Sequence, residues 1–129
     1  MIKIKGGMSM NEKLKKHETI INAKGINNKT AVMCACEYGH YDIVKYLIGL
    51  GANIDTFTRD GNTPLHYAVM SDNIEIVRLL LINSPKLLEY QNREGHTVLT
   101  IAELNNNAAM VKLIKYYMDK ITKKAINNM

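Results

Sequence analysis

Cysteines and long apolar runs are scarce in this chain of 129 residues, and their scarcity excludes several classes of protein. The two cysteines, Cys34 and Cys36, cannot build the disulfide framework of a small secreted domain, so a reducing compartment is expected. No run approaches the ~18 apolar residues of a membrane-spanning helix, and residues 1–10 lack the apolar core of a signal peptide. The sequence therefore predicts a cytoplasmic protein, or one that enters a host cytoplasm by another export route.

Aromatic residues and catalytic motifs are also sparse. The chain has one Phe and no Trp, and the lysines behind its net charge of +5 crowd residues 3–16 and 112–124. Because basic residues are not interleaved with aromatics, a nucleic-acid interface is not expected. The glycine-rich phosphate loop, the hydrolase nucleophile motif and the zinc-protease motif are all missing. We therefore expect no catalytic site, no cofactor and no small-molecule substrate.

Cysteine and histidine lie close together at Cys34, Cys36 and His40, which raises the question of a metal site. Two residues that are two apart on a helix point to different faces, so both sulfurs could not readily bind one ion. No second cysteine pair is available. We expect these side chains to pack between helices, and no metal to bind.

One short block of sequence recurs three times along the chain. It reads TAVMCA from Thr30, TPLHYA from Thr63 and TVLTIA from Thr97, so the spacings are 63 − 30 = 33 and 97 − 63 = 34. A second, apolar block follows each threonine at a constant offset, at 43–48, 76–81 and 110–115. Repeats of this period indicate a solenoid, in which each unit buries its apolar face against its neighbours.

Local signals divide each unit into two helices. In the middle unit Thr63 is a favourable N-cap and Pro64 suits the first helical position, so a helix is predicted to run to about Met70. Residues 71–73 break it. Residues 74–82 predict a second helix so rich in apolar side chains that we expect it to form the inner layer of the stack.

These features resemble the ankyrin repeat, through the T-P-L-H box at residues 63–66 and the Gly-His and Gly-Ala-Asn segments of residues 39–40 and 51–53. The resemblance implies an all-α solenoid of stacked helix-turn-helix units joined by hairpin-like loops. It also implies that His66 ties a turn to a helix by hydrogen bonds and does not act as a base. The residues expected to have structural roles are Gly61, Thr63, Pro64, His66 and Gly95. The sequence departs from the family pattern at Asn28, where glycine is usual.

The resemblance also divides the chain into segments. They are a flexible N-terminus (1–10), an N-terminal capping helix or degenerate repeat (11–28), repeats at 29–58, 59–92 and 93–117, and a C-terminal cap extension (118–129). The lysine-rich, amphipathic stretch 109–126 has a second interpretation, as a helix that binds calmodulin-like proteins or an anionic membrane surface. A cap is favoured over this, and the alternative predicts that the helix is not docked.

A protein-binding role follows from the resemblance, because an ankyrin array presents a rigid concave face of loop tips and first helices. We expect a monomer that masks or scaffolds a partner protein, with Tyr38, Met70 and Leu104 as its apolar anchors. The full predicted set is Lys29, Glu37, Tyr38, Arg59, Asp60, Asn62, Met70, Ser71, Arg93, Glu94, His96, Leu104 and Asn105. The alternative is a regulatory or targeting module of a larger enzyme, of a host-directed effector or of a viral protein.

Overall fold

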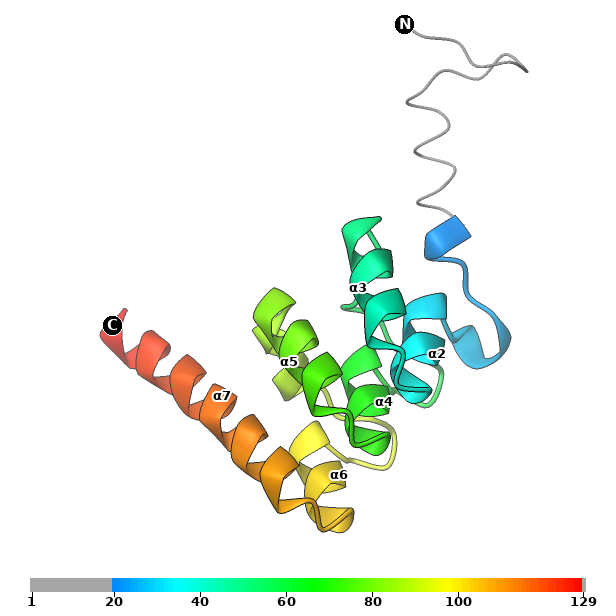
Figure 1. Cartoon of the computed structure of the whole chain (residues 1–129). Helices are drawn as coiled ribbons and strands as arrows, with labels where there is room; N and C mark the ends of the chain where they lie inside the picture. Colours follow the sequence, from blue (N-terminus) through cyan, green and yellow to red (C-terminus); the bar gives the residue numbers. More distant parts are fainter. Residues whose placement is uncertain (1–19, 129) are drawn as a thin grey trace, which may run out of the picture.

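The computed structural model describes residues 20–128, which form three pairs of α-helices stacked in sequence order (Figure 1). The pairs are α2 (Ala31–Glu37) with α3 (Tyr41–Gly49), α4 (Pro64–Met70) with α5 (Ile74–Asn83), and α6 (Val98–Leu104) with α7 (Ala108–Asn127). Two 3-10 turns, η1 (Ile26–Asn28) and η2 (Pro85–Glu89), lie in the loops. The described residues contain no strand, and the predicted all-α solenoid is confirmed. The predicted flexible segment 1–10 lies outside the described residues, as do residues 11–19 of the predicted cap at 11–28.

A threonine begins each first helix. The hydroxyl oxygens of Thr30, Thr63 and Thr97 each accept a hydrogen bond from the backbone N–H three residues later, at 3.3–3.4 Å. This contact satisfies one of the four N–H groups that a helix leaves without an internal partner. The regular recurrence of threonine in the sequence therefore marks the helix starts directly.

The turn inside each pair requires a left-handed residue. Gly39, Asp72 and Asn106 occupy the same position of the three units, with φ of 73°, 56° and 55°. Asp and Asn tolerate this conformation better than other residues with a side chain. The turn is thus kept in the second and third units, although they have no glycine at this position.

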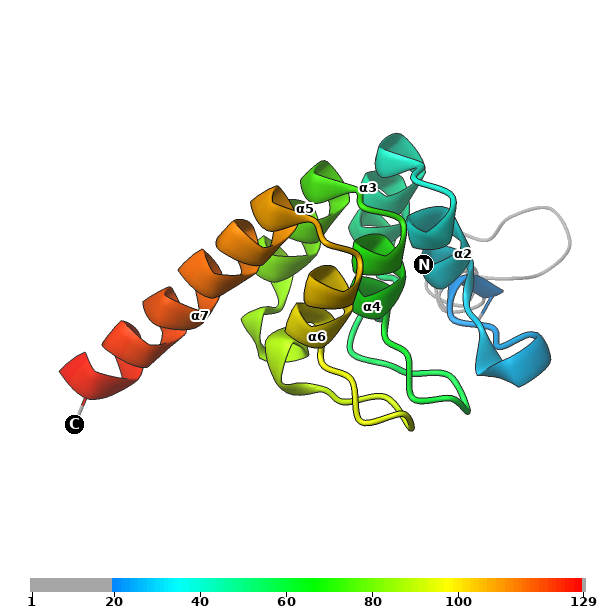
Figure 2. The same cartoon turned by 90° about the horizontal axis from the view of Figure 1, so that it is seen from below.

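The first helices form the inner layer of the stack. Helix α4 packs between α2 and α6, while α3, α5 and α7 form the second layer (Figures 1 and 2). Every residue of α4 from Pro64 to Val69 is buried, whereas α5 exposes Arg78 and 70% of Ile82. The prediction that the second helix is the inner layer is wrong, because α5 has solvent on its outer face and α4 has a helix on each side.

Hydrogen bonds join the loops into a row at one side of the molecule (Figure 2). The backbone N–H of Arg59 donates to the carbonyl of Asn27 at 3.0 Å, and that of Arg93 donates to the carbonyl of Asp60 at 2.9 Å. Each loop is thus bonded to the loop before it. Because the two bonds use equivalent positions, the spacing of the loops repeats from unit to unit.

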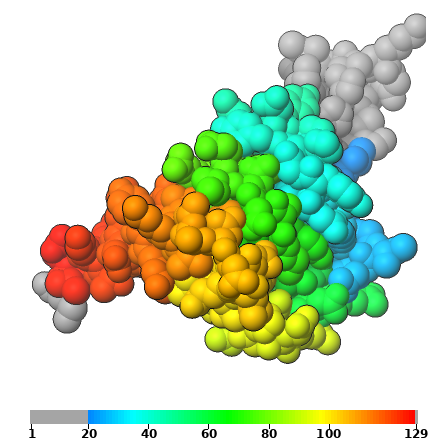
Figure 3. Space-filling model, turned by 60° about the horizontal axis from the view of Figure 1, so that its bottom comes forward, coloured from blue at the N-terminus to red at the C-terminus, as the bar shows by residue number. Residues whose placement is uncertain are grey.

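Helix α7 is continuous from the third pair to Asn127 and has no break near residue 117. Met110 and Ile114 are buried, and Tyr117 and Ile121 pack against the core, while residues 122–128 are exposed. In Figure 3 the end of α7 projects beyond the bands formed by the units. The helix is therefore docked as far as Ile121, contrary to what a free basic helix at 109–126 requires.

The longer spacing between the last two units reflects η2, which packs against α5 and α7. Leu87 and Leu88 of η2 are buried in the shared core. None of the helices in the described part of the chain is long and apolar enough to span a membrane.

Candidate functional site

His66 is built into the frame. Its Nδ1 accepts a hydrogen bond from the backbone N–H of Thr63 at 3.2 Å and lies 2.9 Å from the hydroxyl of that residue. Its Nε2 donates to the carbonyl of His96 in the next loop, at 3.0 Å. Burial is the main cause of the lowered pKa of His66, which keeps the ring neutral in these contacts. The ring therefore links two units, and its side chain is fully buried.

The other predicted structural residues lie where the loops turn. Thr63 and Pro64 are buried at the start of α4. Gly61 and Gly95 have φ of 81° and 80° at equivalent loop positions. At Gly61 a Cβ atom would lie 3.0 Å from Cα of Asn92. The loop that contains Gly61 therefore packs directly against the loop that contains Asn92.

Three exposed apolar side chains lie where the first helices end. Tyr38 is 71% exposed after α2, Met70 is 41% exposed at the end of α4, and Leu104 is 64% exposed at the end of α6. Because α2 packs against α4 and α4 against α6, the three helix ends follow one another along the stack. Asn105 is also exposed, next to Leu104. We call these three residues the row of helix ends and, together with the loop tips that precede the first helices, the concave face.

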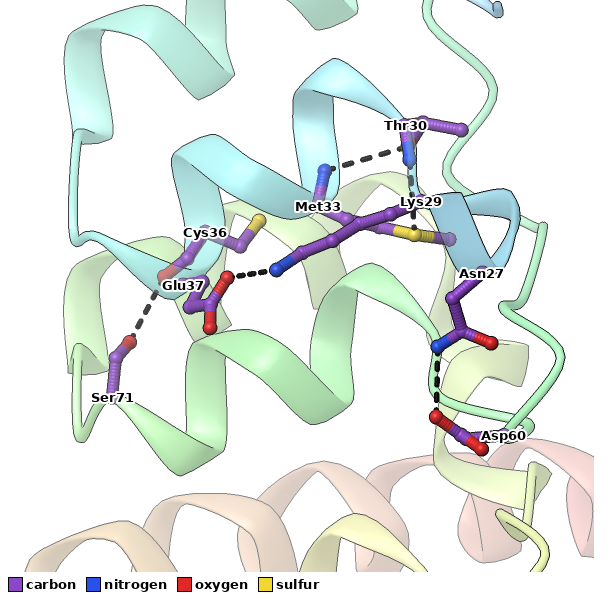
Figure 4. A network of polar contacts seen from close by, with 8 residues as sticks. All are labelled: Asn27, Lys29, Thr30, Met33, Cys36, Glu37, Asp60 and Ser71. Atoms are coloured by element: carbon purple, nitrogen blue, oxygen red, sulfur yellow. Dashed lines mark hydrogen bonds and ion pairs between the residues drawn. The ribbon is translucent and has the colours of Figure 1, made fainter. Parts of the chain in front are cut away.

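Two of the predicted charged residues are paired with each other. The ammonium of Lys29 forms an ion pair with the carboxylate of Glu37 (Figure 4). The same ammonium lies 4.8 Å from the ring centroid of Tyr67. The hydrogen bond to Glu37 is the main cause of the raised pKa of Lys29. This pair holds the first loop against α2 and α4, and the two charges neutralise each other.

Ser71 and Asp60 also connect units (Figure 4). The Ser71 hydroxyl makes 3.0 Å contacts with the carbonyls of Cys36 and Ala68, which join the ends of α2 and α4. Asp60 is exposed, and its carboxylate accepts a hydrogen bond of 2.7 Å from Nδ2 of Asn27. Both residues thus have a structural task besides any contact with a partner.

The remaining predicted residues lie on the loop tips. Asn62 is half-buried and its Oδ1 accepts from Nδ2 of Asn92 at 3.0 Å. His96 is half-buried, 4.0 Å from the exposed carboxylate of Glu94. Arg59 and Arg93 are exposed and form no ion pair with any residue between 20 and 128. Among the predicted residues, these two arginines are thus exposed cations outside any ion pair of the described part.

Nucleophilic and metal-binding chemistry finds little support in the described residues. Cys36 is buried, and burial raises the pKa of its thiol to about 12, so the sulfur stays protonated at neutral pH. Cys34 is exposed. Residues 20–128 hold no group of three His, Cys, Asp or Glu side chains placed to bind one ion.

One surface feature escaped the sequence reasoning. The ring centroids of Phe57 and Tyr90 lie 6.3 Å apart, and both rings line a hollow of about 590 Å³ on the loop row. Phe57 is 54% exposed. These residues belong to different units, so only the spacing of the repeat could have suggested that they meet.

The sequence is similar to a known protein family and to several known proteins. A family model described as "Ankyrin repeats (3 copies)" matches residues 4–87, which end before α6. Leucine-rich repeat serine/threonine-protein kinase 1 of Caenorhabditis elegans is 33% identical over 88 residues, covering 68% of this chain and 4% of that protein. BCL-6 corepressor-like protein 1 of Homo sapiens is 35% identical over 91 residues, covering 69% of this chain and 5% of that protein. The putative ankyrin repeat protein FPV014 of fowlpox virus (strain NVSL) is 36% identical over 84 residues, covering 65% of this chain and 19% of that protein. The chain thus spans less than a fifth of the length of each of these relatives.

Proposed function

This chain belongs to the ankyrin-repeat family, whose repeats are generally protein-interaction modules, and from that premise we propose that it masks or scaffolds a partner protein bound to its concave face. The observation that carries the proposal is the row formed by Tyr38, Met70 and Leu104. Exposed Tyr, Met and Leu side chains on a rigid frame are suited to the apolar centre of an interface. The proposal assigns binding and no reaction.

The frame supports binding because little of it has to be ordered by the partner. The loop tips are joined by backbone hydrogen bonds, and the first helices are packed side by side. A preorganised surface loses less conformational entropy on association, so more of the contact energy appears as affinity. Arg59 and Arg93 are exposed on the loop tips that precede α4 and α6, and would add polar contacts to the apolar ones at the helix ends.

Affinity capture with two matched triple variants tests the concave face. The first variant is Tyr38→Ala, Met70→Ala, Leu104→Ala. The second removes one exposed apolar side chain from each outer helix, as Tyr46→Ala, Ile82→Ala, Tyr116→Ala. The partner captured by the wild type is identified by mass spectrometry, and its Kd for all three proteins is measured by calorimetry. Circular dichroism confirms equal folding.

The expected result follows from the usual cost of truncating an interface anchor. Three anchors at more than ~1 kcal/mol each predict that the first variant binds about 100-fold more weakly, with the second within about threefold of wild type. A partner that tolerates the first variant and is lost with the second would refute the concave face as the binding surface.

The length of the relatives favours a second candidate function, as the targeting or regulatory module of a longer protein. The chain matches only 4% of the length of the Caenorhabditis elegans kinase and 19% of the fowlpox virus protein. An antibody raised against the chain distinguishes the two cases on an immunoblot of the source organism. A single band at the mass of the 129 residues alone opposes the module, and a larger band supports it. We expect the isolated chain to be a monomer.

A further inference from the structure

The hollow on the loop row is separate from the row of helix ends. Its lining residues include Phe57, Arg59, Tyr90 and Arg93, and none of the lining residues belongs to an α-helix. Only the two arginines are shared with the residues predicted for the concave face. We call this hollow of about 590 Å³ the loop groove.

The loop groove has an aromatic wall. The rings of Phe57 and Tyr90 come from consecutive loops and meet at a tilt of 44°. Phe57 leaves about half of its surface in water, and Tyr90 is half-buried. A ligand side chain that covers these rings would remove apolar surface from water without any rearrangement of the loops.

The charge of the loop groove is one-sided. Lys24, Arg59 and Arg93 line it, and among its lining residues only Asp55 is acidic. The Asp55 carboxylate accepts a hydrogen bond from the hydroxyl of Ser84 and lies 3.8 Å from the ammonium of Lys86, neither of which lines the groove. The negative charge of Asp55 is thus already balanced by Lys86, which lies outside the groove lining. No ion pair within the described part of the chain uses any of the three lining cations.

The two arginines are also held in place. Each backbone N–H donates to a carbonyl of the preceding loop, so the two guanidinium groups extend from equivalent, fixed points of the row. Arginine presents a planar fork of donors that matches a carboxylate, and two such forks on successive loops suit acidic residues spaced along one extended strand.

We propose that the loop groove binds an extended acidic segment of a protein partner, with carboxylates on Arg59 and Arg93 and an apolar side chain against Phe57 and Tyr90. The proposal rests on the proposed function only in taking the ligand to be a protein. It adds a second surface and the chemistry of what that surface recognises, namely alternating or clustered Asp and Glu around one aromatic residue.

A synthetic peptide tests the proposal on the full chain. The probe is a fluorescein-labelled decapeptide of Asp and Glu with one central Phe, and binding is followed by fluorescence polarisation and by backbone amide NMR shifts. Arg59→Glu with Arg93→Glu is compared with Lys112→Glu with Lys115→Glu on α7. Both variants lower the formal net charge by four, from +5 to 5 − 4 = +1. Phe57→Ala tests the aromatic wall, and Arg59→Gln with Arg93→Gln serves if charge reversal impairs folding.

We expect the groove variant to weaken binding by about tenfold or more, Phe57→Ala by about fivefold, and the α7 variant by less than about twofold. Amide shifts should concentrate at residues 55–61 and 90–93. Equal weakening by both charge variants would reduce the interaction to net charge and overturn the proposal. So would the absence of binding at millimolar peptide, equal binding of a decapeptide with Lys in place of its acids, or tighter binding of a ten-nucleotide oligothymidylate.

The concave-face variant separates this test from that of the proposed function. Tyr38→Ala, Met70→Ala, Leu104→Ala should leave the affinity for the acidic peptide unchanged. If the peptide fails to bind while the captured partner still depends on the triple variant, the loop groove fails and the concave face stands. If instead the peptide binds and the triple variant still captures the partner, the loop groove is the binding surface and the concave face is not.

Discussion

Two loop glycines provide a matched test of how tightly the units pack. Gly61 and Gly95 have nearly equal φ, 81° and 80°, at equivalent positions. A Cβ atom at Gly61 would lie 3.0 Å from Cα of Asn92 and 3.1 Å from the backbone nitrogen of Arg93. At Gly95 it would meet nothing within 4 Å. Alanine therefore introduces the same backbone strain at both sites but a collision at only one.

The magnitudes follow from these two effects. Left-handed backbone costs a residue with a Cβ roughly 1–2 kcal/mol, and alanine recovers about 0.4–1 kcal/mol by restricting the unfolded chain. Gly95→Ala should thus lower the free energy of unfolding by about 1 kcal/mol. Gly61→Ala must also displace the neighbouring loop by a few tenths of an ångström, which adds about 1–3 kcal/mol. We expect a total near ~2–4 kcal/mol.

Urea unfolding followed by circular dichroism in the far ultraviolet measures both variants under one set of conditions. The difference between their midpoints, at equal slope, isolates the contact between loops from the strain of the turn. Equal losses of stability would show that the loops yield at no cost, and would refute the view that the loop row is a rigid platform. The NMR shifts of the two variants should differ likewise, with Gly61→Ala perturbing the next unit.

Three further outcomes are expected. The pKa of His66 is lowered in the folded protein, so its stabilising contribution is complete above the unfolded value of about 6.5 and is lost as the pH falls towards the folded value. The urea midpoint of the wild type should accordingly drop more between pH 7 and pH 5 than that of His66→Ala, and parallel profiles would contradict this. Met33→His places an imidazole where the next unit has His66. A hydrogen bond from this ring to the following loop should raise the free energy of unfolding by about 0.5–1.5 kcal/mol. A loss of stability would show that the first unit cannot form this hydrogen bond. A double-mutant cycle with Lys29→Met and Glu37→Gln should give a coupling free energy of about 0.2–1 kcal/mol in the stability of the fold, and this coupling should shrink in concentrated salt. Strictly additive effects of the two substitutions would show that the ion pair does not stabilise the fold.

Much of the fold could be predicted from the sequence because its signals are local. Threonine caps and Pro64 define where the first helices begin, and α4 ends at Met70 as expected. The second helix of the middle unit extends to Asn83, one residue beyond the prediction. The layer assignment failed for a different reason. Apolar content shows that a helix is buried, but not which of two helices has neighbours on both sides.

The candidate site was less predictable, since side-chain pairing depends on rotamers and on the neighbouring unit. The resemblance placed Tyr38 and Leu104 at helix ends, where the structure shows them exposed. Nothing local indicated that Lys29 would pair with Glu37 within the face. The contact of Phe57 with Tyr90 was equally hidden, because it joins two loops whose relative position the stacking of the units decides.

The loop row gives the two proposed surfaces a common physical basis. Arg59 and Arg93 belong to both, and each is bonded through its backbone to the preceding loop. The ring of His66 ties the last loop to α4, so the row is also connected to the helices that end in the apolar anchors. A partner that meets either surface thus meets groups whose spacing is already set, and it has little ordering to impose. Recognition then depends on which side chains project from the frame, and these can differ between repeat proteins while the hydrogen bonds beneath them stay the same.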